Sequence, residues 1–171
     1  MALLDILRYP DARLRTTAQP VETITPDIQQ LIADMIETMN HHDAMGLAAS
    51  QVDVHKRIIV LATGDDYSDI RAYINPVVTL LGDETLDVPE SCLSVVGIPT
   101  EIAAKMMVKR SLNINLKALD REGNPVDFDA SGVLAICLQH EVDHLNGILY
   151  VDHTTQDIQE QIHHCELATP A

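Results

Sequence analysis

The stretch Gln139-His140-Glu141-Val142-Asp143-His144-Leu145-Asn146-Gly147 contains two histidines four residues apart, with a glutamate directly after the first. On an α-helix, four residues correspond to about 400° of rotation and roughly 6 Å of rise, so both imidazoles project from one face. Two neutral imidazoles in this arrangement bind one metal ion, and the adjacent glutamate reaches a water on the same ion. The pattern HExxH therefore predicts a metal-dependent hydrolase, with His140 and His144 as ligands and Glu141 as general base.

The residues before this stretch favour a helix that carries the histidines on a buried face. Residues 131–138 are apolar and compatible with a helix, and Gly147 is suited to end it. One stripe at helical spacing contains Val133, Ile136, Cys137, His140 and His144. Buried imidazoles need partners, so a metal site is favoured over a chance pattern on a polar face.

A third ligand is needed, because catalytic zinc sites use three protein ligands and a water. One zinc-protease class takes it from HExxHxxGxxH, but Tyr150 stands at that position, and the two later glutamates lie in a short tail. Upstream, Cys92 offers a thiolate, which is a good ligand for a soft or borderline metal. Cys137 is an alternative ligand, although such a cysteine is more often a small buried filler.

Three segments together resemble the motifs of the peptide deformylase family. Gly46-Leu47-Ala48-Ala49-Ser50-Gln51 is similar to GxGLAAxQ, residues 90–94 are similar to EGCLS, and the nonapeptide at 139–147 matches the third motif throughout. The order and separations also fit, and the likeness continues into supporting stretches at residues 6–15, 54–60, 74–76 and 118–123. The resemblance therefore covers nearly the whole chain.

The resemblance implies an α+β fold, with antiparallel β-sheets packed around a C-terminal HExxH helix. It implies hydrolysis of the N-formyl group from the formylmethionine end of nascent peptides, with release of formate. The metal would be held by Cys92, His140 and His144. Ferrous iron is the ion it implies in the cell, with zinc, nickel or cobalt able to occupy the site.

The resemblance also assigns roles around the metal. Glu141 would move the proton, and the Gln51 side-chain amide and the Leu93 backbone N–H would donate to the oxyanion. Gly46 would let the backbone approach the substrate closely. The pocket for the methionine side chain would be lined by Met45, Val133, Ile136, Cys137 and His140, although core packing is an equal alternative for each apolar member.

Two further residues are expected to support the site, and three positions depart from the family pattern. Glu90 is expected to pair with Arg110, and Asp143 to face away from the metal and make a supporting hydrogen bond. The departures are Ala44 and Ser91, each in place of a motif glycine, and Pro99, which stands where many members hold an arginine. The segment 95–109 that contains Pro99 is longer than usual.

Composition limits the remaining possibilities. The 171 residues are expected to form one catalytic domain, 1–171, with a short acidic tail at 154–171. No apolar run approaches a membrane span, and no signal or transit peptide is recognisable, so a cytoplasmic protein is expected. With 11 basic and 26 acidic residues, the net charge of −15 opposes binding to nucleic acids and anionic membranes. Transient proximity to the ribosome is compatible with the resemblance, but no Lys or Arg follows Arg121, so a basic docking helix is not expected.

Local signals predict several elements. Thr25 is expected to cap a helix with Pro26 at its first position, and the helix is expected to end in the segment 40–43. Strands are expected at 57–62, 72–74, 77–81 and 112–119.

Two competing functions are a non-catalytic metal-binding relative, which would not need Glu141 and Gln51, and a protease for internal peptide bonds, which would need another downstream ligand.

Overall fold

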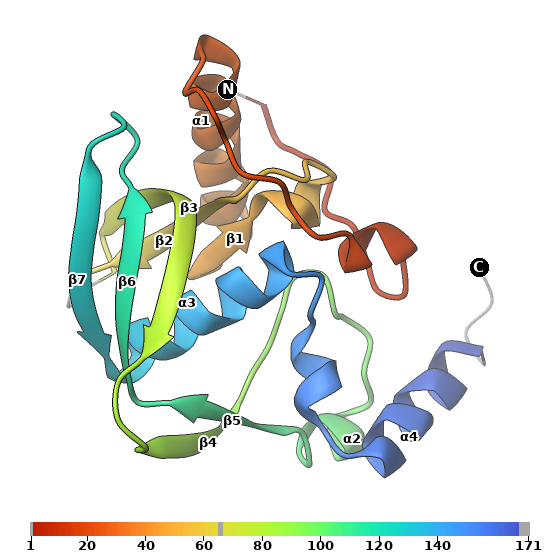
Figure 1. Cartoon of the computed structure of the whole chain (residues 1–171). Coiled ribbons are helices and arrows are strands. Elements are labelled where there is room, and N and C mark those ends of the chain that lie inside the picture. Colours follow the sequence, from red (N-terminus) through yellow and green to blue (C-terminus); the bar gives the residue numbers. More distant parts are fainter. Residues whose placement is uncertain (1, 65–66, 168–171) are drawn as a thin grey trace.

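The computed structural model describes residues 2–64 and 67–167 and arranges the strands in two sheets (Figure 1). The larger sheet has the order β1-β2-β3-β6-β7, and the smaller one pairs β4 with β5. All pairings between these strands are antiparallel. The strands are β1 Gly46–Ala48, β2 Ile58–Thr63, β3 Asp69–Leu80, β4 Thr85–Pro89, β5 Met107–Ser111, β6 Asn113–Leu119 and β7 Pro125–Ser131.

Four α-helices and three short 3₁₀ turns complete the described part of the chain. The first helix begins as expected, because the Thr25 side chain accepts a hydrogen bond from Ile28 N at 3.4 Å and Pro26 occupies the first turn. The helices are α1 Pro26–His41, α2 Thr100–Ala103, α3 Gly132–Leu145 and α4 Gln156–Leu167, and the turns are η1 Ala12–Arg15, η2 Ala49–Val52 and η3 Tyr150–His153. None of the described helices is long and apolar enough to span a lipid bilayer.

Strand β2 forms the centre of the fold because it is covered on both faces. All six of its residues are buried. Ile59 and Leu61 point into the cluster that α3 covers, whereas Ile58 and Val60 point into the cluster that α1 covers. Figure 1 shows α3 running between the two sheets, so the predicted α+β fold with antiparallel sheets around the HExxH helix is confirmed.

Helix α3 packs through a different face from the one expected. Ala135, Leu138 and Leu145 are fully buried in the core. The expected buried stripe begins at Val133, which is 49% exposed, and passes through Ile136 and Cys137, which are partly buried and line a cavity. Helix α3 has apolar residues on two faces. The sequence alone does not tell which face packs into the core and which one lines a pocket.

Strand β3 joins two segments that were predicted as separate strands, 72–74 and 77–81. A register shift between Ile74 and Val77 accommodates the intervening Asn75 and Pro76. Asn75 has φ of 53°. Its side chain accepts a hydrogen bond from Val21 N at 2.8 Å and donates one to Val21 O at 2.9 Å, which attaches the N-terminal segment to the sheet.

A third cluster of buried apolar residues lies away from the large sheet. It joins the N-terminal segment, the loop between β4 and β5, η3 and α4. Figure 1 shows α2 beside α4 in this region. The segment expected as a short acidic tail therefore contains a helix with buried residues as far as it is described, and residues 168–171 of that segment lie outside the described part.

Candidate active site and metal centre

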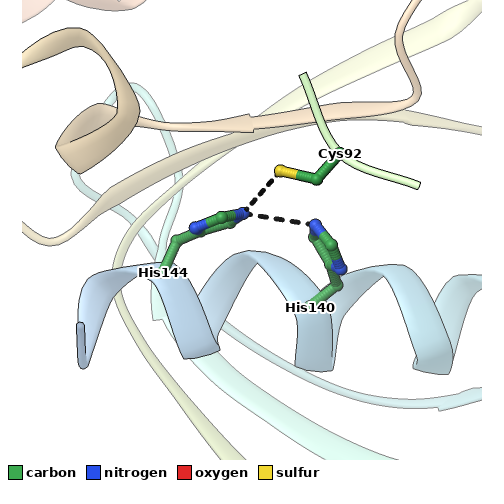
Figure 2. Close-up of side chains that lie close together, drawn as sticks. All are labelled: Cys92, His140 and His144. Carbon is green, nitrogen blue, oxygen red and sulfur yellow. Dashed lines mark hydrogen bonds between the residues drawn. The ribbon is translucent and has the colours of Figure 1, made fainter. Parts of the chain in front are cut away.

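The structure brings Cys92, His140 and His144 together over α3 (Figure 2). The two histidines stand one turn apart on the helix, and Cys92 approaches from the loop after β4. The two Nε2 atoms are 3.2 Å apart, and Sγ of Cys92 lies 3.2 Å from Nε2 of His144. Within the described residues, these three form the group whose ligand atoms all lie within 4.8 Å of one another.

These separations fit one tetrahedral ion. Nitrogen ligands about 2.0–2.1 Å and sulfur ligands about 2.3 Å from a zinc ion lie roughly 3.3–3.6 Å apart when the angles are tetrahedral. One sulfur and two imidazoles suit zinc and other first-row divalent ions, and three ligands leave a position open for a water. Cys137 is not in the group. Burial, with the charges of Glu141 and Glu90, raises the pKa of Cys137 to about 11, so its thiol stays protonated and is a poor ligand.

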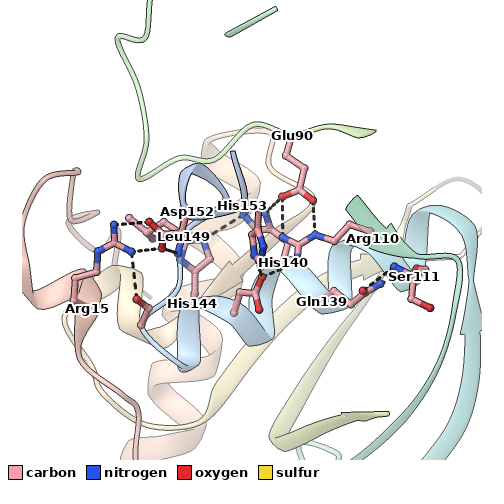
Figure 3. A network of polar contacts seen from close by, with 12 residues as sticks. Arg15, Glu90, Arg110, Ser111, Gln139, His140, His144, Leu149, Asp152 and His153 are labelled. Atoms are coloured by element: carbon pink, nitrogen blue, oxygen red, sulfur yellow. Dashed lines mark hydrogen bonds and ion pairs between the residues drawn. The ribbon is translucent and has the colours of Figure 1, made fainter. Parts of the chain in front are cut away.

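Glu90 orients His140 from the side opposite the cluster (Figure 3). Its Oε2 lies 2.7 Å from Nδ1 of His140, which directs Nε2 toward the other ligands. Arg110 donates from Nε to Oε1 of Glu90 at 2.6 Å and from Nη2 to Oε2 at 3.1 Å. The expected pair is therefore present, and because the Arg110 and Glu90 side chains are 4% and 6% exposed, it is not a solvated surface pair.

Further contacts tie α3 to β5. Arg110 Nη1 donates to Oδ2 of Asp143 at 2.6 Å, and His153 Nε2 lies 2.9 Å from the same oxygen. Asp143 is thus not a ligand and makes the supporting bond expected of it. The Gln139 amide donates to the Ser111 carbonyl at 2.8 Å and accepts from its N–H at 3.1 Å. These bonds hold both histidines in a fixed frame.

The electrostatic environment favours a cation between the three ligands. Burial raises the pKa of Glu90, but hydrogen bonds from His140 and Arg110 outweigh it and lower this pKa to about 2. Burial lowers the pKa of His140, but its contacts with Cys92 and Glu90 prevail and raise it to about 10. The site thus stabilises a positive charge here, and a metal ion would displace the proton when it binds Nε2. Burial and the nearby His140 charge lower the pKa of His144 well below its usual value, so this imidazole is neutral and able to coordinate a metal.

Glu141 lies beside the ligands with its side chain packed against Gly46. The residue is 5% exposed, and its buried Oε2 has no hydrogen-bond partner among the described residues. A Cβ atom on Gly46 would lie 2.5 Å from Oε1 of Glu141, so only glycine leaves room for the carboxylate. Burial raises the pKa of Glu141 to about 7, and the positive charge of His140 opposes this rise.

Gln51 is held next to the cysteine ligand. Its Oε1 accepts from Ala48 N at 2.8 Å, while its Nε2 donates to Ser94 Oγ at 3.1 Å and to Cys92 Sγ at 3.4 Å. Ser94 N also donates to Cys92 Sγ at 3.4 Å, a contact that was not predicted. The sequence carried no signal for this contact, because it depends on the turn that the chain makes after Cys92.

A cavity of about 720 Å³ opens beside the cluster. It is lined by all of the residues predicted for the substrate pocket, Met45, Gly46, Val133, Ile136, Cys137 and His140, and also by Gln51, Cys92, Leu93 and Glu141. The departures Ala44 and Ser91 line it too. The lining residues that were not predicted are His42, Asp43, Val88, Pro89, Glu90 and Val96. Most of these come from the loop before β1, from β4 and from the loop after Cys92, where the chain has no periodic pattern.

Comparisons with known proteins identify the relatives of this chain. The family model described as polypeptide deformylase matches residues 3–160. A peptide deformylase of Chromohalobacter salexigens is 51% identical over 90% of this chain and 86% of its own length. The peptide deformylase of Pseudomonas aeruginosa is 48% identical over 90% and 88%. Among solved structures, the Ehrlichia chaffeensis peptide deformylase in complex with actinonin is 32% identical, covers 100% of both chains and superposes with a TM-score of 0.86.

Proposed function

The chain belongs to the polypeptide deformylase family and is a peptide deformylase, a hydrolase of the N-formyl group, and we propose that the residues around Cys92, His140 and His144 perform this hydrolysis on formylmethionine ends of nascent peptides. The observation that carries the proposal is the position of Glu141. Its carboxylate is buried, interacts with the charge of the ligand His140 and lines a cavity that is mainly apolar. A general base at the open side of a metal site is the arrangement that amide hydrolysis needs.

The family depends on a metal, and we infer that this chain holds one divalent ion through Cys92 Sγ and the Nε2 atoms of His140 and His144. Ferrous iron is the proposed ion in the cell, with zinc, nickel or cobalt as replacements. When bound, such an ion supplies Lewis acidity, which polarises a carbonyl and lowers the pKa of water toward neutrality. Glu90 and Arg110 keep the ligands in place.

Glu141 has the proton-transfer role. Its Oε2 takes a proton from the water that attacks the formyl carbon and then delivers this proton to the departing amine nitrogen. A pKa raised to about 7 by burial suits both steps, because a group that must accept and release a proton near neutral pH works best with a pKa in that range. Gly46 keeps the space that the carboxylate occupies.

Gln51 and Leu93 have the role of stabilising negative charge on the formyl oxygen. The Gln51 amide is fixed through Oε1 by Ala48 N, so its NH₂ group keeps facing the cluster. The longer of its two donor contacts, 3.4 Å to Cys92 Sγ, is the one that a substrate oxygen would replace. Leu93, next to the cysteine ligand, also lines the cavity.

The methionine side chain would enter the apolar part of the cavity. Ile136 and Cys137 are partly buried there, while Met45 and Val133 stand nearer the opening, with 38% and 49% of their surface exposed. Burial of an unbranched apolar side chain of this kind contributes about 1.5–3 kcal/mol. Formylmethionine would thus be selected by an apolar pocket and oriented by polar groups at the reacting end.

We propose that the enzyme acts in the cytoplasm, where nascent formylated chains are found, and that it does not dock on ribosomes through its last helix. Helix α4 contains Asp157 and Glu160 and no Lys or Arg. A helix of this charge is repelled by the phosphates of ribosomal RNA.

Formate release tests this function. Protein purified anaerobically with Fe(II) should release formate from formyl-Met-Ala-Ser. Glu141→Gln should reduce kcat by about 10²–10⁴-fold, because it removes the proton acceptor without changing the shape of the side chain. Metal content should stay near one ion per chain in this variant. Glu122→Gln, in an exposed turn, is the matched control. A fully metal-loaded wild-type protein that releases no formate would disprove the function.

A second measurement tests the ligand set. Cys92→Ala should lose most of its metal, since a three-ligand site that keeps only two imidazoles binds far more weakly. Cys137→Ala should retain its metal because its sulfur lies outside the group. Undiminished metal binding by Cys92→Ala would exclude Cys92 as a ligand.

A further inference from the structure

The segment from Cys92 to Arg110, which contains α2 and most of β5, is fixed firmly at both ends. At its start, Cys92 belongs to the ligand group, and Val95 N donates to Cys92 O at 3.1 Å. At its end, Arg110 is buried and binds both Glu90 and Asp143. The part between these ends is exposed in several places and needs its own support if it is to hold one position.

Near Cys92 the N-terminal segment gives such support, since Tyr9 N donates to Ser94 O at 2.7 Å. Further along, the support is apolar and includes α4, which contacts α2. The backbone hydrogen bonds within α2 and its flanks are local, such as Ile102 N to Pro99 O at 2.9 Å and Met106 N to Ala103 O at 3.0 Å. The loop is attached through the side chains of Ile102 and Met106, which are 8% and 2% exposed.

The partners of these side chains on α4 belong to the same buried cluster. Ile158 and Ile162 are 8% and 2% exposed, and they occur four residues apart, so they lie on one face of the helix. The opposite face is polar, with Gln159 and Glu160 exposed. Helix α4 thus presents one apolar stripe to the third cluster and the other face to solvent.

The supported loop also forms part of the substrate cavity. Val96 lines the cavity and is 58% exposed, whereas its neighbour Val95 is buried in the third cluster. Val95 therefore anchors the segment, while Val96 faces the cavity. Its high exposure puts Val96 at the mouth of the cavity, where the residues after formylmethionine would lie.

We propose that Ile158 and Ile162 are positioning residues that act through the 95–106 loop, and that Val96 on this loop is a specificity residue for the part of the peptide that follows formylmethionine. The inference rests on the proposed function, because it assigns the mouth of the same cavity. The chain would thereby contact an extended substrate through an apolar side chain of this loop.

The first test compares a long and a short substrate. In Ile158→Ala/Ile162→Ala, KM for formyl-Met-Ala-Ser should rise roughly tenfold, the loss expected when about half of a buried valine contact is removed. KM for formyl-Met alone and kcat for both substrates should stay unchanged. Ile158→Val/Ile162→Val should restore the wild-type KM, and Glu160→Ala on the exposed face is the matched control. Equal KM increases for both substrates would overturn the proposal.

A double-mutant cycle tests whether α4 acts through Val96. Val96→Ala alone should reproduce the rise in KM for formyl-Met-Ala-Ser. Its effect should not add to that of the α4 variant, because residues that act on one contact are coupled. Fully additive effects would show that α4 acts elsewhere and would overturn the proposal.

Hydrogen exchange separates this proposal from the proposed function. The α4 variant should exchange amides of residues 95–106 at least about tenfold faster, while amides of α3 keep their protection. This result is independent of catalysis, so it supports the role of α4 even if the wild type releases no formate. Unchanged exchange in the loop would overturn the role of α4, whatever the activity.

Discussion

At the scale of single residues, Gly46 controls the position of Glu141. A Cβ at this position would lie 2.5, 2.9 and 3.0 Å from the Oε1, Cδ and Cγ atoms of Glu141. Gly46→Ala should therefore displace the carboxylate and lower kcat by on the order of 10²-fold while leaving the three metal ligands in place. Formate release measured together with metal content checks this. If Gly46→Ala kept the wild-type kcat, the Glu141 side chain would have moved without any effect on catalysis.

Arg110 offers a second test at this scale. One guanidinium joins Glu90 and Asp143 through bonds of 2.6–3.1 Å, and a lysine ammonium cannot reproduce this fork. Arg110→Lys should weaken metal binding about 10–100-fold, as loss of a partner behind a metal ligand does. Competition with a chelator measures the affinity. Arg71→Lys, in the exposed pair with Asp69, is the control and should match the wild type.

The individual residues of the site differ in how far sequence could predict them. His140, Glu141 and His144 follow from local spacing, because a helix determines their relation. Cys92 is 52 residues from His144, and its approach depends on the fold, so only thiolate chemistry and family resemblance pointed to it. The reason for Gly46 was also beyond the sequence, since the space beside a distant glutamate is a three-dimensional property.

At the scale of elements, Asn75 combines a bulge in β3 with attachment of the N-terminal segment. Asn75→Ala should reduce the free energy of unfolding by about 2–4 kcal/mol, because it leaves buried groups of Val21 unpaired and puts alanine at a positive φ. Asn75→Gly loses the same hydrogen bonds, but glycine adopts a positive φ without strain. This variant should therefore be about 1 kcal/mol more stable than the alanine variant. Denaturant unfolding measures both. The opposite order would contradict this account.

Elements with strong local signals were the predictable ones. Helix α1 begins at Pro26 after Thr25, β2 follows an apolar run, and β6 follows an alternation of polar and apolar residues. Strands β4 and β5 were not predicted, because their residues are mostly exposed or charged and pair only with each other. Helix α4 has few apolar residues, Ile158, Ile162, Cys165 and Leu167, so only the contact of its two isoleucines with the third cluster reveals why it forms.

At the scale of the whole molecule, the charge of −15 should make stability depend on salt. Like charges repel across the surface, and added salt screens them, so Tm should rise as NaCl increases from about 10 to 200 mM. A gain of about 1–2 kcal/mol would shift Tm by roughly 2–8 °C in a chain of this size. Calorimetry at fixed metal loading measures it. A falling Tm would show that attractive pairs dominate instead.

The ligand group also has a mechanical consequence for the chain as a polymer. Cys92 and His144 are 52 residues apart, so an ion bound by both cross-links the chain and closes a long loop, much as a disulfide would. In the chain-entropy model, a cross-link over a loop of this length stabilises the folded state by about 4 kcal/mol. Oxidation of one sulfur would then open a cross-link as well as end catalysis, so the inactivated enzyme should also be the one most readily unfolded and degraded.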